Sequence, residues 1–528
     1  MTTKSKQSKR QWLQRTAIGT LTIAILGLGY TVKGETFEEQ IWSAVKTGLM
    51  DLGLIAEMDL HPLERREQNE NDLVLDTAKF MFMSQMKSLF DKTHRDAHAK
   101  AHGCVAGDFE VLAGSPAWAQ KGLFATPAHY EALVRYSNGS GKTANDQKPD
   151  GRGMAIKVIG GAPKGNLLGI GNNQDFMMIN FPKFFSRSIR DYAHFNKCAL
   201  NGDLGPYFAH RAIREAFTPV LGEAVAEGLA GADVDVVLVN AVTIFTLTPK
   251  LDKTQEEQEK LNQAFGILSQ ILRTNGYAGQ DLIAKTKETL SAIGEKLSAM
   301  KPQADPNNVL PNLAKAPREF QIVMGIQSAP IPSALNTSYF SMASFAFPTD
   351  GQVANDTAVK YSVHPVPCSE AGKPSESTGP HSSVKTIPPL DPQAVDVLTE
   401  TLTSSMAAQD YCFNFVVEAL DSDLELEKKR SQVEDSTLDF SKSQKAIVAT
   451  LKMRAQDNSS PAQKEYCENL SFNPWHARPE YRPLGAMNRA RRVAVKASSL
   501  RRHDLLLNPS AKEIEPTTFA DFANFNSK

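Results

Sequence analysis

A series of short strand-like segments constrains the fold of this chain more than any other feature. Most are rich in β-branched or aromatic residues and are bounded by Gly, Asn, Asp or Pro, which is typical of strands joined by turns. They read CVAGDFEVLA, EALVRYS, GMAIKVIG, DFMMIN, VDVVLVNAVTIFTL, SYFSMASFAF, AVKYSVHPV and CFNFVVEAL. Because helical segments lie between these short strands, the pattern predicts an antiparallel β-barrel in an α+β chain.

Two regions show helical spacing of their apolar residues. The first covers residues 36–95. The second covers residues 251–316, where Leu261, Phe265 and Leu268 lie on one helical face of the stretch 256–272, and the stretch 281–300 repeats the pattern. We interpret the second region as a helical insertion between strands with a structural role, either a lid or a partner surface. Residues 368–391 are rich in Ser, Pro and Gly and predict a long loop, and we expect the polar tail after Pro509 to be loose.

The N-terminus carries the pattern of a secretory signal or signal anchor. Basic residues precede the apolar run 16–32, and no acidic residue occurs before Glu35. The run is at the lower limit of length for spanning a bilayer, so we expect export to a periplasmic or membrane-anchored location, with cleavage left open. A buried N-terminal helix of a cytosolic protein is the alternative, and the cluster of positive charges fits it poorly.

Composition and cysteine usage exclude several classes of protein. The net charge of −1 gives no basic field to attract nucleic acid, and 41% hydrophobic with 22% charged residues is ordinary for a globular protein. The cysteines are widely spaced without a C-x-x-C pair, which argues against a zinc module or a disulfide scaffold. Their odd number allows one or two bridges and leaves at least one thiol: Cys104, Cys198, Cys368, Cys412 and Cys467.

The segment RDAHAKAHGC contains a set of chemically active side chains. His94, His98 and His102 have the i, i+4, i+8 spacing that would align three metal ligands on a helix. However, Gly103 and the strand pattern after it end any helix here, and no H-E-x-x-H motif is present. Cys104 lacks the sequence surroundings of a catalytic nucleophile. Neither a metal triad nor a cysteine nucleophile is therefore favoured.

Three further segments, VRYSNGSGKTANDQKPDGRGMAIKVIG, LLGIGNNQDFMMINFPKFF and FNPWHARPEYRPLGAMNRARRVAV, give RDAHAKAHG a context. Together and in this order, the four resemble the sequence blocks of the haem catalase superfamily. Those blocks read R-x-x-H-A-K-G, R-F-S, D-x-R-G-F-A-x-K-F, then G-N-N followed by aromatics and F-P, and finally N-P with a later L-G and N-R. The resemblance covers residues 95–250 and 318–500 and is closest to the shorter, divergent catalase-like proteins.

The resemblance implies a catalase-like eight-stranded antiparallel β-barrel with surrounding helices and a helical insertion. The chain then divides into six parts. These are a signal peptide or anchor (1–34), an N-terminal helical segment (35–94), the first part of the barrel (95–250), the insertion (251–317), the second part of the barrel (318–505) and a polar tail (506–528).

The resemblance also implies a buried pocket for haem b. His98 matches the distal histidine, which moves a peroxide proton, a task that suits imidazole because its pKa lies near working pH. Ser137 matches the serine that orients this ring, and Asn172 matches the asparagine that polarises the bound peroxide. Arg95 and Arg135 match arginines that pair with the haem propionates, which suit planar, permanently charged guanidinium groups.

Other positions take supporting roles in this interpretation. Phe176 matches an apolar wall of the pocket. Residues of the D-x-R-G block are expected to be structural, and we expect His94 and His102 to make satisfied hydrogen bonds and the thiol of Cys104 to be packed. The structural residues of the block are Asp150, Arg152 and Lys157.

One departure from the family is large. In catalases an R-x-F-x-Y segment after the N-R block supplies a tyrosinate to the iron. Here no tyrosine follows Tyr481, so the expected metal ligand is missing. His503 is the one conventional ligand type in this tail, and an exposed, non-ligating histidine is the favoured interpretation. Strong catalase turnover is therefore not expected.

Two functional hypotheses follow. The first is a haem-binding, catalase- or peroxidase-type enzyme that acts on hydrogen peroxide or on an organic (lipid) hydroperoxide. The second is a catalytically inactive catalase-fold protein that serves for binding or as a scaffold at the membrane. The expected partners are a small-molecule peroxide, a membrane through the N-terminal segment and a second copy in a homo-oligomer, but no nucleic acid.

Overall fold

The computed structural model describes most of the chain outside the N-terminal 36 residues. The described residues are 37–55, 57–86, 95, 97–141, 143–205, 207–208, 211, 252–274, 278–281, 284, 288, 318–328, 333–349, 351–373, 395–503 and 514–524. They form two compact units. The first contains the described residues up to 183 and from 326 onward, and the second contains those from 184 to 325.

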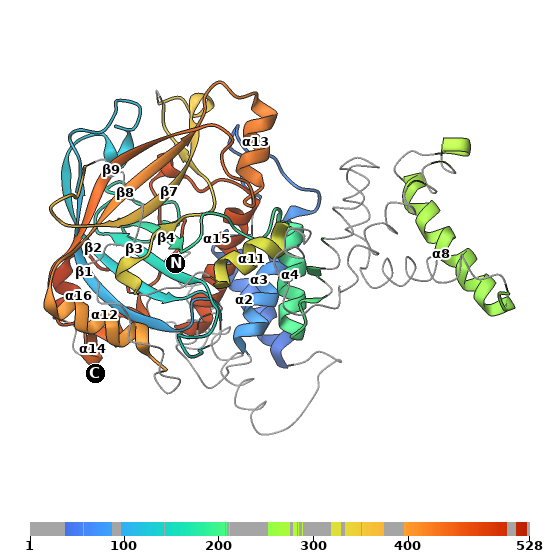
Figure 1. The fold of residues 1–528 in the computed structure, drawn as a ribbon, viewed down its shortest axis with the longest axis horizontal. Coiled ribbons are helices and arrows are strands. Elements are labelled where there is room, and N and C mark those ends of the chain that lie inside the picture. The colour runs from blue at the N-terminus through green and yellow to red at the C-terminus, as the bar shows by residue number, and fades with distance from the viewer. Residues whose placement is uncertain are drawn as a thin grey trace, which may run out of the picture. The chain divides into compact units, whose positions relative to one another are not determined.

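The first unit is built on a closed antiparallel β-barrel (Figure 1). The barrel strands are β1 Ala101–Val111, β2 Ala128–Asn138, β3 Arg152–Val158, β4 Gln174–Ile179, β5 Tyr339–Phe340, β7 Thr357–Val366, β8 Tyr411–Leu420 and β9 Ser443–Met453. They pair in the order β5-β4-β3-β2-β1-β9-β8-β7, and β5 also pairs with β7, which closes the ring. The short strand β6, Phe345–Phe347, adds to β7. The predicted eight-stranded antiparallel barrel is confirmed.

Side chains fill the inside of the barrel because each strand turns alternate residues inward. In β2, Val134 and Tyr136 belong to the interior cluster, whereas Arg135 and Ser137 lie on the opposite, outer face. Aromatic rings occupy the centre, and the rings of Phe176 and Phe415 lie 4.7 Å apart between centroids. The interior is therefore a packed core.

The strand predictions agree with the structure for most of the described residues, but the segment predicted at 338–347 forms two short strands, β5 and β6, and one strand was not predicted. The segment predicted at 234–247 lies outside the described residues. Strand β9 was not predicted, because it begins with the exposed polar residues Ser443, Gln444 and Lys445 and becomes apolar only further on. Its period-two pattern is therefore visible only in its second half.

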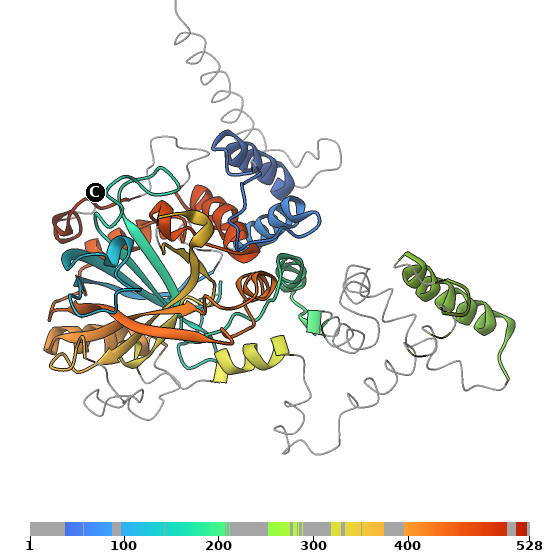
Figure 2. The same ribbon diagram turned by 90° about the horizontal axis from the view of Figure 1, so that it is seen from above.

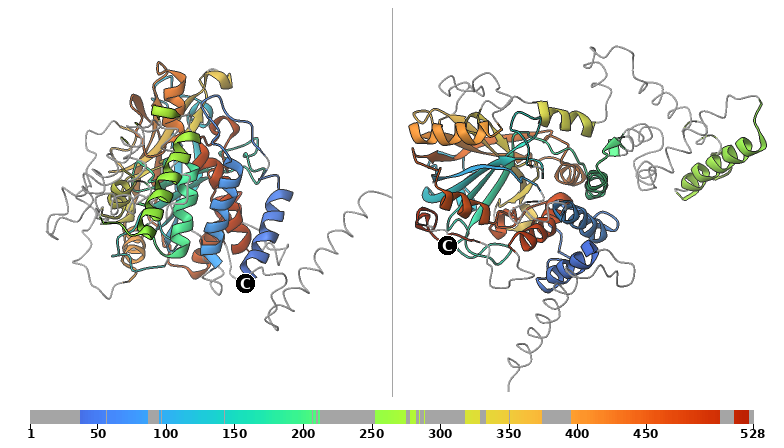
Figure 3. Two further views of the ribbon diagram at one scale, coloured as in Figure 1. Left: turned by 90° about the vertical axis from the view of Figure 1, so that its right-hand side faces the viewer. Right: turned by 90° about the horizontal axis from the view of Figure 1, so that it is seen from below.

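Helices surround the barrel. α15 Ala486–Arg502 lies between the barrel and the pair α2 Phe37–Asp51 and α3 Glu70–Met86 (Figures 2 and 3). α12 Val397–Ala408 and α14 Pro461–Asn469 pack against β1, and α13 Leu426–Glu434 follows β8. Among the described residues, 3₁₀ helices lie at η1 Gly122–Phe124, η2 Ala334–Asn336, η3 Val353–Asn355 and η4 Pro479–Tyr481. The predicted helical character of residues 36–95 is confirmed for α2 and α3.

One arginine joins the N-terminal helical segment to α15. The guanidinium of Arg489 pairs with the carboxylates of Glu64, Glu70 and Glu434, all largely withdrawn from solvent. Glu64 also accepts a hydrogen bond from the backbone of Gly485, at the start of α15. These carboxylates outweigh the effect of burial and raise the pKa of Arg489 above its ordinary value. The network therefore holds residues 61–70 against the N-terminal part of α15.

The second unit contains α4 Ile189–Asn201 and α8 Gln255–Thr274, and α11 Arg318–Ser328 spans the boundary between the units. The hydroxyl of Ser188 caps α4 by accepting a hydrogen bond from the backbone of Asp191. The first predicted helix of the insertion is confirmed as α8, while the second, at 281–300, falls largely outside the described residues.

Disulfide bonds link distant parts of the first unit. Cys104 of β1 pairs with Cys467 of α14, 363 residues later, and Cys368 pairs with Cys412 of β8. Cys198 is a buried thiol. The expectation that Cys104 is a packed thiol was wrong, because the chain returns to β1 at α14, a contact that the spacing of the cysteines does not reveal.

Residues 514–524 of the C-terminal tail contact the first unit, so this part of the tail is not loose as expected. Ile514 pairs with Leu470, and α16 Phe519–Ala523 buries Phe522. Between them, Glu515 bonds the buried amine of Lys157. Within the described part of the chain, no helix has the length and apolar character needed to cross a bilayer, and the apolar run 16–32 lies outside it.

Candidate functional site

His98 lies just before β1, at one end of the barrel. Its backbone has a positive φ of 58°, and its N–H donates to the carbonyl of Gly139 at 3.1 Å. The ring lies directly over Gly153 of β3. A Cβ at that position would come within 2.5 Å of Nδ1, closer than real atoms approach. Only glycine therefore lets the imidazole lie on this strand.

Two neighbours fix the His98 ring. Nδ1 lies 2.8 Å from the carbonyl oxygen of Asn138 and 3.1 Å from Oγ of Ser137. Because a carbonyl only accepts, Nδ1 carries the proton and donates to Asn138, which leaves the lone pair on Nε2. Burial, and then the charge of Arg135, lower the pKa of His98 to about 4. The imidazole is therefore neutral at neutral pH, with Nε2 as a base.

Arg135 supports the backbone of His98. Its Nη2 donates to the His98 carbonyl at 3.1 Å and lies 3.5 Å from Oε1 of Glu468. Its Nε is buried and makes no hydrogen bond to any residue that the structure describes. Arg135 is thus close to the predicted site, with one donor still available.

Arg95 caps the C-terminal end of α14. Its Nη2 donates to the carbonyls of Glu468 and Leu470, each at 3.1 Å, and Arg502 bonds the same two carbonyls. These carbonyls lie where α14 ends, and a helix C-terminus favours cations because its last carbonyls lack partners within the helix. The structure therefore gives Arg95 a capping contact where the sequence predicted a propionate contact.

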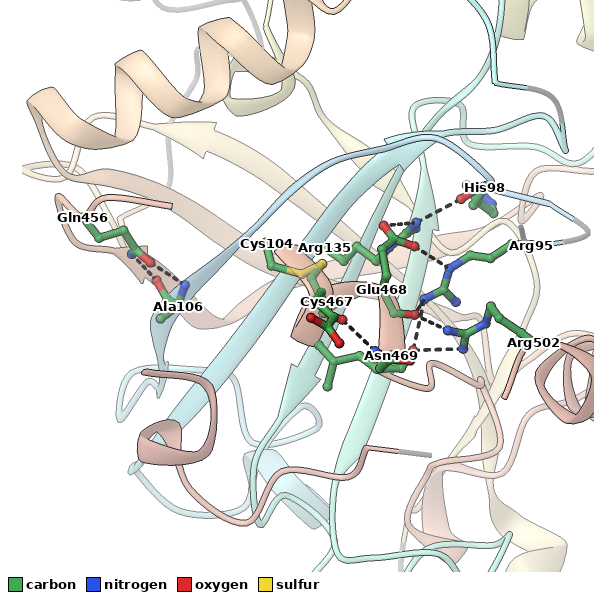
Figure 4. The surroundings of a disulfide bond; sticks show 12 residues. Arg95, His98, Cys104, Ala106, Arg135, Gln456, Cys467, Glu468, Asn469 and Arg502 are labelled. Carbon is green, nitrogen blue, oxygen red and sulfur yellow. Dashed lines mark hydrogen bonds and ion pairs between the residues drawn. A yellow bond between two sulfur atoms is a disulfide. The ribbon is translucent and has the colours of Figure 1, made fainter. Parts of the chain in front are cut away.

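Glu468 places a carboxylate between the two predicted propionate arginines (Figure 4). Oε2 lies 3.8 Å from Nε of Arg95, in addition to the contact of Oε1 with Arg135. Burial by itself raises the pKa of Glu468, but the charges of Arg135, Arg95 and Arg502 outweigh it and lower the pKa. Glu468 directly follows the disulfide residue Cys467, so the bridge to β1 fixes its position. Sequence reasoning missed Glu468, since a single acid in α14 has no distinguishing pattern.

The structure separates Asn172 from His98, so the predicted asparagine contact was wrong. The side chain of Asn172 is exposed in the turn before β4. In the β3–β4 register, Gly153 under His98 faces Ile179, at the other end of β4. Asn172 lies in a bend before β4, and the strand from Gln174 to Ile179 by itself spans about 17 Å at a rise of about 3.3 Å per residue. The neighbouring Asn173 is buried and donates to Glu515 at 2.8 Å.

Phe176 lies inside the barrel, so its prediction as a wall of the pocket was also wrong. Its side chain is 1% exposed and packs edge-on against Tyr361. The next residue, Met177, lies on the outer face, where it faces Ala155 and, beyond it, Arg135 in the strand registers. A shift of one residue along a strand exchanges the two faces of the sheet. Arg135, Ala155 and Met177 thus form a row across β2, β3 and β4, called here the outer row.

α15 turns one of its faces toward the outer row. Nη2 of Arg491 lies 3.8 Å from Sδ of Met177. Arg491, Val495 and Arg502 share this face, because residues four and seven positions apart align on a helix. The described residues of the face include no tyrosine. Of the predicted site residues, His98, Ser137 and Arg135 thus lie together on the barrel, and this face of α15 carries no tyrosine.

The remaining histidines that the structure describes do not complete a metal site. Both ring nitrogens of His503 lie 3.0 Å from carbonyl oxygens, Nδ1 from Ser499 and Nε2 from Asn469, and the side chain is buried instead of exposed. His102 is buried 3.8 Å from Asp146, and burial lowers its pKa to about 4. His94 lies outside the described residues. Within the described ranges, no group of His, Cys, Asp or Glu side chains has the arrangement of a metal site.

The D-x-R-G-x-A-x-K block has structural contacts. The amine of Lys157 bonds both oxygens of Asp175, at 2.8 and 3.1 Å, and both oxygens of Glu515 at 3.1 Å. His476 adds a contact of 2.8 Å to Asp175. Lys157 and Asp175 are fully buried, and each keeps the other charged: the pKa of Lys157 is raised and that of Asp175 is lowered, in both cases against the effect of burial. The cluster joins the two catalase-like blocks to the C-terminal segment.

Two small cavities lined by described residues lie away from the predicted site. One borders α3 and Arg489, the other borders Lys360, and each has a cavity volume of about 30 Å³. Neither includes a residue of the outer row.

Comparison with known proteins finds no matching family model and no matching curated protein. Among solved structures, the chain is similar to a fungal catalase (TM-score 0.39, 14% identity), catalase A from Saccharomyces cerevisiae (0.40, 13%) and a bacterial catalase (0.39, 14%). Each match covers 80% of this chain but only 63%, 65% and 60% of those catalases, respectively. The chain therefore spans less than two thirds of their length.

Proposed function

We propose that this chain is a catalase-related, haem-binding protein that binds the cofactor beside Arg135 of the outer row and acts on a hydroperoxide at His98. The observation that carries the proposal is the state of His98: a neutral imidazole, fixed through Nδ1, with Nε2 free to accept a proton. This is the arrangement a proton-transfer residue needs, because both its orientation and its charge are set before the substrate arrives.

The barrel side of the site suits a flat, carboxylate-bearing group. Ala155 is small, the neighbouring Met177 is apolar, and both are half-buried, while Gly153 is covered by the His98 ring. Arg135 retains a buried Nε that has no partner among the described residues and could donate to a carboxylate. Haem b, when bound, would supply a redox-active iron.

The α15 side lacks the family's iron ligand. The family's R-x-F-x-Y motif is not found after the N-R block, and no tyrosine follows Tyr481. A tyrosinate favours cleavage of the peroxide O–O bond by donating electron density, so the missing tyrosine predicts slow turnover. The absence of Asn172 from the site also removes the amide that would polarise the peroxide.

The chain's own residues would handle the proton. His98 Nε2 accepts the proton of the hydroperoxide and returns it to the other oxygen. Ser137 and the carbonyl of Asn138 keep Nδ1 protonated during this exchange, so Nε2 stays the reacting nitrogen. Arg135 holds the His98 backbone by bonding its carbonyl.

An exported, membrane-anchored location is part of the proposal. Two disulfides link the first unit, and such bonds persist mainly in oxidising compartments. Together with the basic and apolar N-terminus, they support a periplasmic site of action. Anchoring to a membrane would bring the chain close to lipid hydroperoxides, which makes these the preferred substrates, with hydrogen peroxide second. Assembly as a homo-oligomer also belongs to the proposal.

Replacement of His98 tests this function. In the haem-loaded full-length protein, His98→Ala should abolish hydroperoxide consumption while the Soret band, the strong haem absorption, remains. Arg135→Ala should reduce haem retention, because a propionate would lose its charged partner. Unchanged turnover in the His98 variant would contradict the proton-transfer role, and unchanged haem content in the Arg135 variant would contradict the proposed propionate contact.

A second function, binding without catalysis, is favoured by one observation. Glu468 already places a carboxylate beside Arg95 and Arg135, where the cofactor carboxylates are expected. A protein that remained colourless after supplementation with haem would support this alternative.

A further inference from the structure

We propose that the carboxylate of Glu468 pairs with Arg135 in the ligand-free protein and competes with the carboxylate of the ligand, which displaces it on binding. The inference concerns the control of the same site and rests on the proposed function for the place where the ligand binds. It assigns Glu468 a role in setting affinity, distinct from catalysis.

The contact between Glu468 and Arg135 is loose. Charge-assisted N–H···O bonds are commonly about 2.7–2.9 Å long. Oε1 lies 3.5 Å from Nη2 of Arg135, and Oε2 lies 3.8 Å from Nε of Arg95. The short contacts of both guanidinium groups go instead to main-chain carbonyls. The carboxylate is therefore held mainly by charge, and a better-placed carboxylate could replace it.

Arg135 has the donor that such a ligand needs. Its Nη2 already bonds the His98 carbonyl, but its Nε is buried without a hydrogen-bond partner in the described part of the chain. A buried donor without a partner costs free energy, and a ligand oxygen at Nε would recover it.

Displacement of the Glu468 side chain need not move the main chain. The carbonyls of Glu468 and Leu470 are held by Arg95 and Arg502. The preceding residue is held by the Cys104–Cys467 disulfide, next to Arg135 in the β1–β2 register (Figure 4). The side chain itself is 24% exposed, so it has a path to solvent. Rotation about the side-chain bonds of Glu468 is therefore enough to move its carboxylate away from Arg135.

The ligand class follows from the surroundings. Arg135 offers a charged group for one carboxylate, and Ala155 and Met177, next to it in the outer row, pack against an apolar cluster but remain half-buried, so part of their apolar surface is accessible. The ligand is therefore a carboxylate attached to a flat or extended apolar body. A porphyrin propionate and a fatty acid share this chemistry.

The test measures binding of iron-free protoporphyrin IX to the full-length protein by fluorescence. Its dimethyl ester, palmitate and methyl palmitate serve as parallel probes. Glu468→Gln removes the competing charge, and Glu465→Gln, an exposed acid of the same helix, is the matched control. We expect Glu468→Gln to bind protoporphyrin IX about tenfold more tightly than wild type, with the dimethyl ester unaffected. A gain for palmitate instead would identify a fatty acid as the ligand.

The tighter binding of protoporphyrin IX by Glu468→Gln must also depend on Arg135. Adding Arg135→Gln to Glu468→Gln should remove it. Equal or weaker binding by Glu468→Gln, or an equal gain for both esters, would overturn the inference. If Glu468→Gln does not fold, Glu468→Asp gives the same test, because the shorter acid reaches Arg135 less well and should also tighten binding.

Two outcomes separate this inference from the proposed function. If wild type binds haemin and Glu468→Gln binds no more tightly, the inference fails and the function stands. If wild type binds no haemin but Glu468→Gln gains carboxylate binding, the inference stands and haem binding by the native chain fails.

Discussion

His98 should remain neutral far below the pH at which an ordinary histidine titrates. Its pKa is lowered from 6.5 to about 4, first by burial and then by the charge of Arg135. Lowering the pKa from 6.5 to about 4 corresponds to about 3 kcal/mol of preference for the neutral ring over the charged one. This preference is what makes Nε2 available as a base.

The measurement is an NMR titration of the His98 ring between pH 3 and pH 8, with His98→Ala used to assign its signal. We expect a midpoint below pH 5 and the proton on Nδ1. Replacing Arg135 by Gln should raise the midpoint, because a positive neighbour disfavours the imidazolium. A His98 midpoint near 6.5 would refute the reasoning, since the ring would then be solvated and partly charged at neutral pH.

The lowered pKa of His98 also makes the free energy of unfolding depend on pH. A pKa lowered on folding means that the unfolded chain binds the proton more tightly, so the stabilising effect of the neutral ring is complete above pH 6.5 and is lost as the pH falls toward 4. Between neutral pH and pH 4, the unfolding free energy of wild type should fall by up to about 3 kcal/mol more than that of His98→Ala. Urea unfolding at pH 7.5 and pH 4.5 provides the comparison with wild type.

Three further changes test other parts of the structure. Lys157→Met leaves two buried carboxylates without their amine and should cost about 3–5 kcal/mol of unfolding free energy in urea; a cost below 1 kcal/mol would contradict the importance of the cluster. Cys104→Ser with Cys467→Ser should cost about 2–5 kcal/mol and lower the melting temperature, and an unchanged melting temperature would argue against the bridge. Gly153→Ala should displace the His98 ring from its strand and raise its titration midpoint while the circular dichroism spectrum is retained; an unmoved midpoint would contradict the close contact.

The barrel could be predicted because strand signals are local. A period of two, β-branched residues and flanking turns all occur within each segment, and most of the described barrel strands carry them. β9 was missed because Ser443, Gln444 and Lys445 resemble a loop. The order and closure of the strands came from the family resemblance, since local patterns do not fix which strands pair.

The candidate site was harder to predict because it depends on register. His98 and Ser137 come together because their segments are neighbours in the sheet. Phe176 and Asn172 carry suitable side chains, but the phase of β4 turns the first inward, and its register puts the second at the far end of the hairpin. Without an alignment of strands, residue type alone could not exclude either.

Contacts between distant segments left no trace in the sequence. The Cys104–Cys467 bridge joins residues 363 positions apart, and Glu468 reaches Arg135 only because that bridge brings α14 to β1. Charge complementarity of this kind becomes visible only when the fold is known. Arg95 shows the same limit, since a guanidinium suits a propionate and a helix end equally well.

The most direct test of the account is a haemin titration of the purified full-length protein, followed by the Soret absorption band. The account predicts saturation near one haem per chain, with reduced occupancy in Arg135→Ala. A wild-type protein that stays colourless with excess haemin would contradict it.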